Sequence, residues 1–91
     1  MTHRLESWDD YAREFGVNLQ RARHEKRLSQ ERVASAAGIS VFTYRKLEKG
    51  QSNPGTAANP RLRTLIALAE VLETSPESLL PEQLPGIAIG R

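Results

Sequence analysis

The side chains best equipped for chemistry in this sequence are cations, and they are concentrated in its middle. Residues 21–63 hold ten Lys or Arg against three Glu, a formal net charge of +7. Residues 1–20 hold two Arg against four Asp or Glu, a charge of −2, and residues 64–91 hold one Arg against four Glu, a charge of −3. This asymmetry predicts a polyanionic partner for one face of the molecule. A solvated surface with uneven charge is the alternative.

The side chains needed for catalysis or metal binding do not occur in a recognisable arrangement. There is no Cys, and the two histidines, His3 and His24, belong to no metal-binding spacing. No His is spaced to activate a serine, and Gly86 and Gly90 lack the spacing and the following helix of a phosphate-binding loop. We therefore expect no enzyme activity, no catalytic residue, no metal and no cofactor.

Two short helices are predicted in the basic middle, over residues 29–37 and 41–49, and a tight turn joins them. Ser29 and Ser40 are placed to cap these helices, because a serine hydroxyl can accept a hydrogen bond from an unpaired amide of the first turn. A glycine follows each helix, where the chain needs a left-handed exit. A short helix with cations and a few apolar groups on its outer face fits a DNA major groove.

A longer helix is predicted before this pair, from about Ser7 to the basic residues Lys26 and Arg27. Apolar residues at steps of three or four form one stripe along it: Trp8, Tyr11, Phe15, Leu19 and Ala22. Gly16 lies inside the pattern, where glycine weakens a helix. It marks either a kink or a close approach by another helix.

Two further helices are predicted after the pair. Residues 51–60 contain two Asn-Pro steps and no apolar periodicity, which predicts a loop without strands. Asn59 then caps a fourth helix, with Pro60 at its first position. Its apolar residues are Leu62, Leu65, Ile66, Ala69 and Leu72, widened by Leu68 and Val71, and this broad surface is either core or a partner contact. The Ser-Pro step at 75–76 predicts a short fifth helix to about Leu80.

The whole chain therefore predicts one all-α domain. No apolar run approaches the roughly 20 residues that span a membrane, so we expect no membrane partner. The polar, acidic first residues are unlike a signal peptide, and the lack of Cys fits a cytosolic compartment. The apolar tail LPGIAIGR either packs on its own domain, adds to a dimer contact or is loose.

One stretch of the sequence resembles a known family. The pattern FGVNLQRARHEKRLSQERVASAAGISVFTYRKLEKG, followed by LRTLIALAEVL, is similar to the Cro and phage-repressor type of helix-turn-helix domain, the Xre family. The specific features are an arginine late in the first helix, Leu-Ser-Gln before the second, alanine and glycine at the turn, and Leu-Glu-x-Gly closing the third. The resemblance covers about residues 15–80.

The resemblance implies a compact five-helix lambda-repressor-like domain with its helix-turn-helix at the second and third helices. Residues 1–14 would be an N-terminal extension leading into the first helix, 15–80 the DNA-binding domain and 81–91 an apolar tail. The implied function is sequence-specific binding of double-stranded DNA by a repressor-like transcriptional regulator. It would act in the cytoplasm, associated with the nucleoid, as a homodimer on an operator with two-fold half-sites.

Position by position, the resemblance also assigns site residues. It places DNA bases beside Val41, Phe42, Arg45 and Lys46, and it makes Gln30 and Arg61 contacts to the DNA backbone. Arg23 and Glu48 match a salt bridge that holds the first helix to the end of the third. Four neighbouring polar or basic residues complete the predicted backbone contacts: Thr43, Lys49, Asn59 and Arg63.

Two features depart from the family pattern. Val41 and Phe42 are apolar where many relatives carry polar base readers, so they cannot form bidentate hydrogen bonds but can touch a thymine methyl group. A structural role or a protein-binding patch stays open for Phe42. The loop after Gly50 is several residues longer than in the family, and it either donates to phosphates or is a plain spacer.

A second class of function is open on the same residues. The apolar tail, the broad apolar surface of the fourth helix and the acidic ends favour a protein-interaction module, such as the antitoxin of a toxin–antitoxin pair. A protein partner and an operator are not mutually exclusive.

Overall fold

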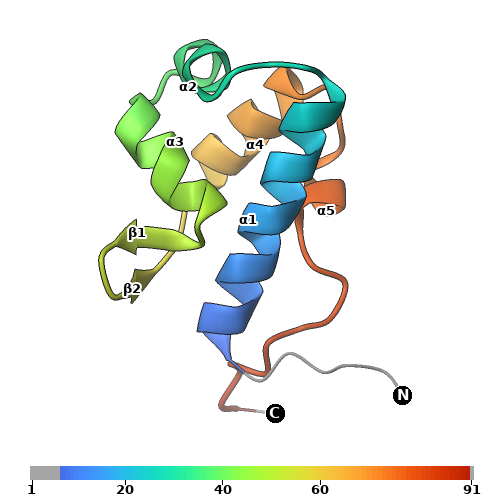
Figure 1. Cartoon of the computed structure of the whole chain (residues 1–91). Coiled ribbons are helices and arrows are strands. Elements are labelled where there is room, and N and C mark those ends of the chain that lie inside the picture. Colours follow the sequence, from blue (N-terminus) through green and yellow to red (C-terminus); the bar gives the residue numbers. More distant parts are fainter. Residues whose placement is uncertain (1–6, 91) are drawn as a thin grey trace.

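The computed structural model describes residues 7–90, which form five helices and one small hairpin (Figure 1). In chain order the elements are α1 (Trp8–Glu25), α2 (Gln30–Ala37), α3 (Val41–Glu48), β1 (Gln51–Asn53), β2 (Thr56–Ala57), α4 (Leu62–Val71) and α5 (Pro76–Leu79). The expected all-α, five-helix fold with a helix-turn-helix at α2 and α3 is confirmed. The predicted division at residues 14 and 80 stays a prediction, and α1 runs unbroken across the first of these boundaries.

The helix ends follow from local sequence chemistry. The Ser29 hydroxyl accepts from the amide of Arg32 at 3.0 Å, and the Ser40 hydroxyl accepts from that of Thr43 at 3.1 Å. Gly38 ends α2 in the left-handed region, with φ of +77°. The predicted caps of the two short helices are confirmed. The Ser7 hydroxyl caps α1 in the same way by accepting from the amide of Asp10.

Two glycines let the backbone of α1 lie directly against the end of α3. A Cβ atom at Gly16 would lie 2.5 Å from the carbonyl oxygen of Glu48. A Cβ at Gly50, which also has φ of +75°, would lie 2.7 Å from the Cα of Arg13. Both glycines are therefore required for two backbones to meet. Of the two alternatives for Gly16, close approach by another helix is confirmed, and α1 continues through this position.

The stretch after α3 contains strands that the sequence did not predict. β1 and β2 pair antiparallel, with Gln51 opposite Ala57 and Asn53 opposite Thr56. Pro54 and Gly55 form the turn between them, because proline favours the second position of a tight turn and Gly55 adopts φ of +78°. The expectation of a loop without strands was wrong, since strands this short carry no readable apolar alternation.

The fourth helix also begins later than predicted. Arg61, not Asn59, is the residue before its first turn, and no side chain caps it. The late start is explained by Ala58, the residue before Asn59, which is buried and makes two hydrogen bonds through its backbone. Its amide donates to the Gly50 carbonyl at 2.8 Å, and its carbonyl accepts from the Trp8 indole at 2.9 Å. These contacts keep the chain extended through the region where Asn59 and Pro60 would have started a helix.

The core is shared by all five helices and the base of the hairpin. Its buried apolar residues are Ala12, Phe15, Leu19, Val33, Ala34, Tyr44, Leu47, Ala58, Leu68, Ala69, Leu72 and Leu79. Leu68 is thus core, as one alternative held, but two members of the predicted α4 stripe are not. Leu62 is 72% exposed and Ile66 is 39% exposed, because α4 is buried mainly along its later turns.

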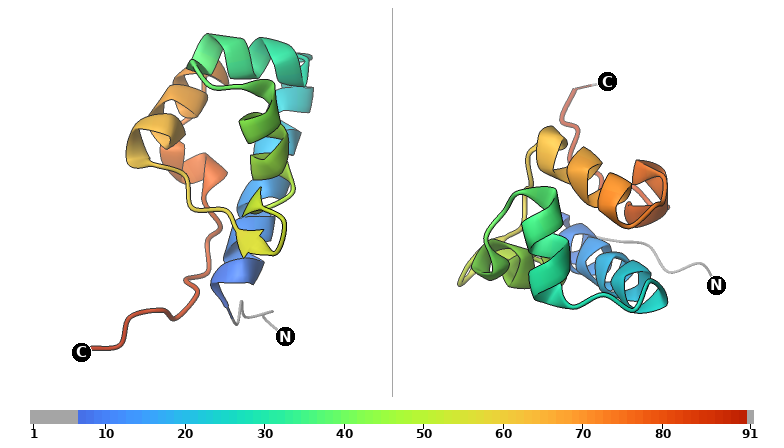
Figure 2. Two further views of the ribbon diagram at one scale, coloured as in Figure 1. Left: turned by 90° about the vertical axis from the view of Figure 1, so that its left-hand side faces the viewer. Right: turned by 90° about the horizontal axis from the view of Figure 1, so that it is seen from above.

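The last helix and the tail lie beside α1. The Ser75 hydroxyl caps α5 as predicted, and the side-chain amide of Asn18 donates to the carbonyl of Leu79. The tail then runs past the start of α1 and away from the body (Figures 1 and 2). Three of its apolar side chains are exposed: Leu84, Ile87 and Ile89. Of the alternatives for the tail, packing of these side chains on their own domain is therefore wrong.

Within residues 7–90, none of the helices has the length and apolar character needed to cross a membrane.

Candidate nucleic-acid interface

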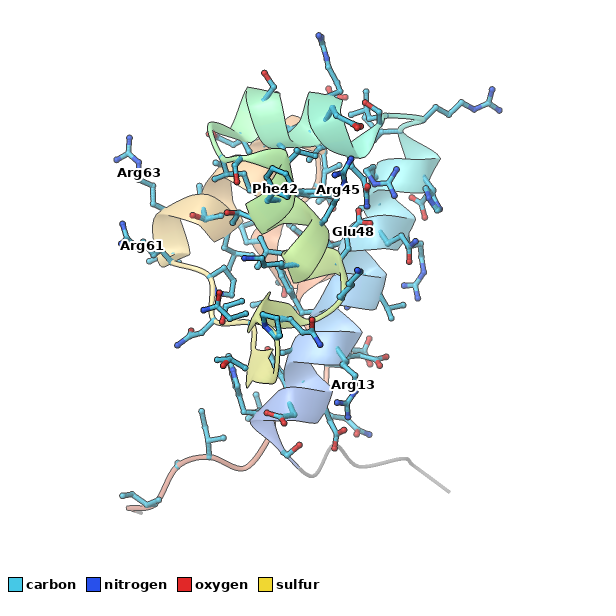
Figure 3. All side chains as sticks on the ribbon, turned by 60° about the vertical axis from the view of Figure 1, so that its left-hand side comes forward. Arg13, Phe42, Arg45, Glu48, Arg61 and Arg63 are labelled. Atoms are coloured by element: carbon cyan, nitrogen blue, oxygen red, sulfur yellow. The ribbon has the colours of Figure 1, made fainter. Side chains whose placement is uncertain are left out.

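The outer face of α3 is fixed by the two side chains that α3 buries. Tyr44 and Leu47 lie in the core, so the opposite side of the helix faces solvent. Phe42 is 70% exposed, although it is a large apolar residue. Figure 3 shows Phe42 and Arg45 on the near face of α3, with Arg61 and Arg63 projecting from the region where α4 begins.

The predicted base contacts are not all equally accessible. Phe42 is exposed, while Arg45 and Lys46 are half-buried. Val41 is also half-buried and packs against the core cluster. Of the two apolar residues in this set, Val41 is therefore less accessible to a ligand than Phe42.

The predicted structural pair is formed beneath this face. The Nε of Arg23 donates to Glu48 Oε2 at 2.6 Å, and its Nη2 donates to Oε1 at 3.2 Å. Both side chains are almost buried, with 11% of Arg23 and 5% of Glu48 exposed. The Nη1 of Arg23 also donates to the carbonyl of Leu28 at 3.0 Å, which ties the end of α1 to the loop before α2.

The ionisation of this pair follows from its contacts. Burial alone would raise the pKa of Glu48, but hydrogen bonds from Arg23 and Gln30 outweigh it and lower the pKa below its ordinary value. Burial raises the pKa of the neighbouring Tyr44, so its phenol stays neutral. The Tyr44 hydroxyl interacts electrostatically with Glu48 but makes no hydrogen bond of normal geometry within residues 7–90.

A chain of hydrogen bonds leads from the buried pair to the surface of α3. The side-chain nitrogen of Gln30 donates to Glu48 Oε1 at 2.9 Å, and its oxygen accepts from Arg45 Nε at 3.2 Å. The Nη2 of Arg45 in turn donates to Glu31 Oε2 at 2.9 Å. The structure thus brings together four of the predicted site residues and adds Glu31. Nothing in the local sequence pointed to Glu31, because it lies 14 positions from Arg45.

Three of the six predicted backbone contacts lie around a cleft. This cleft has a volume of about 400 Å³ and lies between α3, the hairpin and the start of α4. Three predicted residues line it, Thr43, Asn59 and Arg61, together with Leu47, Gln51, Ser52, Pro60 and Thr64. Ser52 belongs to the loop for which contacts to phosphates were one alternative, whereas Gln51 and Thr64 add polar groups that the sequence did not single out. Only the fold brings them beside Thr43.

Several cations on this side keep their charge unpaired. Among residues 7–90, no ion pair engages Lys46, Lys49, Arg61 or Arg63. Lys26, by contrast, is paired with Glu73, which lies in the loop that follows α4. The basic residues at the end of α3 and the start of α4 are therefore among the described cations that no ion pair engages. In the same described residues, no group of three or more His, Cys, Asp or Glu is placed to hold a metal ion.

The chain matches known proteins over most of its length. A family model described as a helix-turn-helix domain matches residues 14–82. The SPbeta prophage-derived uncharacterized HTH-type transcriptional regulator YonR of Bacillus subtilis (strain 168) is 38% identical over 66 residues. That alignment covers 72% of this chain and 56% of the regulator, so the chain spans little more than half of this relative.

Two solved structures share the fold. The restriction-modification controller protein C.AhdI from Aeromonas hydrophila has a TM-score of 0.67 and 30% identity, over 76% of this chain and 96% of that one. FeII HppE in complex with its substrate has a TM-score of 0.64 and 24% identity, over 88% of this chain and 44% of that one, which shows a common fold alone. The match over residues 14–82 shows that this chain belongs to the helix-turn-helix domain family, and the expected Cro and phage-repressor (Xre) type is confirmed.

Proposed function

We propose that this protein is a sequence-specific transcriptional regulator that binds double-stranded DNA and reads the major groove with α3. The observation that carries the proposal is the exposed face of α3, which has free cations beside it and a polar cleft at its flank. An α-helix fits the major groove, and base edges there present distinct patterns of hydrogen-bond donors and acceptors. The names of the regulator and controller relatives support the same function.

The two groups of residues have separate tasks in this proposal. Arg45 and Lys46 read hydrogen-bond acceptors of bases, and Phe42 covers a thymine methyl group. Lys49, Arg61 and Arg63 neutralise phosphates, and Thr43 and Asn59 donate hydrogen bonds to phosphates at the cleft. Gln30 lies at the start of α2, where a phosphate is favoured by the amides of the first turn.

We further propose that the protein binds as a homodimer with a repressor-like role. A single α3 of eight residues reaches few base pairs, so useful affinity requires two half-sites about one helical turn apart. The exposed apolar residues Leu62 and Ile66 on α4 and Leu84, Ile87 and Ile89 in the tail supply a surface for the second copy. Burial of this surface between two copies would remove it from water.

The experiment that tests the proposal is selection of bound sites from a pool of random duplexes. The expected result is one enriched sequence with two-fold symmetry, bound by two copies of the chain as counted by native mass spectrometry. Enrichment of a single half-site would refute the dimer but not the DNA reading. A pool that shows no enriched sequence would refute sequence-specific binding.

A protein-interaction module is the second candidate, and the exposed apolar side chains of the tail favour it. In that case the tail would contact a different protein, as an antitoxin contacts its toxin. Deletion of residues 84–91 separates the two. It should lower dimerisation if the tail joins two copies, and it should leave the dimer unchanged if the tail is reserved for another partner.

A further inference from the structure

The guanidinium of Arg45 is held along one edge by the first turn of α2. Its Nε donates to Gln30 and its Nη2 donates to Glu31, at 3.2 and 2.9 Å. Gln30 is itself fixed by Glu48, whose side chain is almost buried. The plane of this half-buried guanidinium is therefore fixed by contacts that lead to the interior of the protein.

The other end of the same guanidinium is open. No acceptor within residues 7–90 contacts Nη1 of Arg45, and 43% of the side chain is exposed. Guanine offers two acceptors, O6 and N7, in the major groove, and an arginine fork matches them with two parallel N–H groups. A guanidinium that is already oriented loses less conformational entropy when it binds.

Glu31 is an unusual residue to find beside a surface for phosphates. Its side chain is 64% exposed, and its negative charge opposes binding to any DNA. The same carboxylate, however, forms an ion pair with Arg45 and accepts a hydrogen bond from its guanidinium. We propose that Glu31 is a positioning residue that orients Arg45 toward a guanine and thereby sets the specificity of the site. This inference rests on the proposed DNA-binding function.

The proposal predicts opposite effects on two kinds of DNA. Glu31→Gln removes a negative charge, so affinity for random duplex should rise about twofold to fivefold. The same variant frees Arg45, so discrimination in favour of the guanine should fall about threefold to tenfold. Glu25→Gln is the matched control, because Glu25 is an exposed residue with no ion pair among the described residues. It should change both affinities by the same factor.

The closing experiment uses the selected operator and copies in which one guanine at a time is replaced by 7-deazaguanine, which lacks the N7 acceptor. Wild type and Glu25→Gln should lose affinity at one guanine per half-site, and Glu31→Gln should lose clearly less there. In the absence of DNA, the heteronuclear NOE of the Arg45 Nε–Hε group should be that of a rigid group in wild type and should fall in Glu31→Gln.

The outcomes separate the two levels of the proposal. A wild-type protein that enriches no operator refutes the proposed function and the guanine role with it. If the operator is bound but Glu31→Gln and Glu25→Gln respond equally to 7-deazaguanine, the DNA-binding function stands and the role of Glu31 is refuted. An unchanged NOE of Arg45 in Glu31→Gln also refutes it, since the carboxylate then does not hold the guanidinium.

Discussion

Removal of Glu48 tests whether the buried pair holds the helix-turn-helix in place. The side chain of Arg23 is 11% exposed, and Glu48→Ala removes the carboxylate with which it is paired. The same change removes the acceptor of the Gln30 side chain. Loss of one partner from a buried pair costs about 3–5 kcal/mol. Arg23 keeps its hydrogen bond to the carbonyl of Leu28, so we expect the lower end, about 3 kcal/mol. For a chain of this size the melting temperature should fall by about 12–24 °C.

The assay is urea unfolding followed by the fluorescence of Trp8, the single tryptophan, whose indole donates to the carbonyl of Ala58. The control is the double variant Arg23→Met/Glu48→Leu, which removes both charges and fills similar volume. It should be within about 1 kcal/mol of wild type, because no charge is then left unpaired. A loss below about 1 kcal/mol in Glu48→Ala, or a double variant as unstable as the single one, would refute the reasoning.

Three further outcomes are expected. Gly16→Ala should lower stability by about 2–3 kcal/mol in the same urea assay, because its Cβ would meet the backbone of α3, while Gly90→Ala should have no effect because nothing lies within 4 Å of that site. The pKa of Glu48 in the folded protein lies below its ordinary value of 4.5. The ionised carboxylate therefore contributes fully to stability above pH 4.5, and this contribution is lost as the pH falls through the folded pKa. Acid unfolding curves of wild type and Glu48→Gln should converge at low pH. Arg45→Ala should weaken binding to the selected operator more than to random duplex, whereas Arg61→Ala should weaken both by one factor and reduce the slope of log affinity against log salt by about 1; equal losses in both variants would contradict this division between base and phosphate contacts.

The features that the sequence predicted correctly are set by near neighbours along the chain. Ser29 and Ser40 cap their helices through bonds that span three residues, and Gly38 takes a conformation open to few other residues. Arg23 and Glu48 are an exception, since they lie 25 positions apart. Family resemblance alone supplied that pair, and neither spacing nor composition contained it.

The features that the sequence did not predict depend on contacts between distant segments. The late start of α4 follows from the bond between Trp8 and Ala58, which are 50 positions apart. Leu62 and Ile66 have the periodicity of core residues, yet they are exposed, because α4 buries residues of its later turns, Leu68 and Ala69. The contact of Glu31 with Arg45 is also between distant segments, so the sequence did not predict it. A carboxylate at the start of a helix is common because it interacts favourably with the helix dipole, and Glu31 therefore did not stand out.

The contact of α1 with α3 through Gly16 and Gly50 has a consequence for the proposed binding of operators that differ in shape. Two backbones in direct contact have no side-chain layer between them that could repack, so α3 cannot tilt or slide on α1 without breaking the fold. Adjustment must then come from the duplex. Sites that bend easily should be preferred even at base pairs that no side chain reaches, and rigid tracts should be disfavoured there.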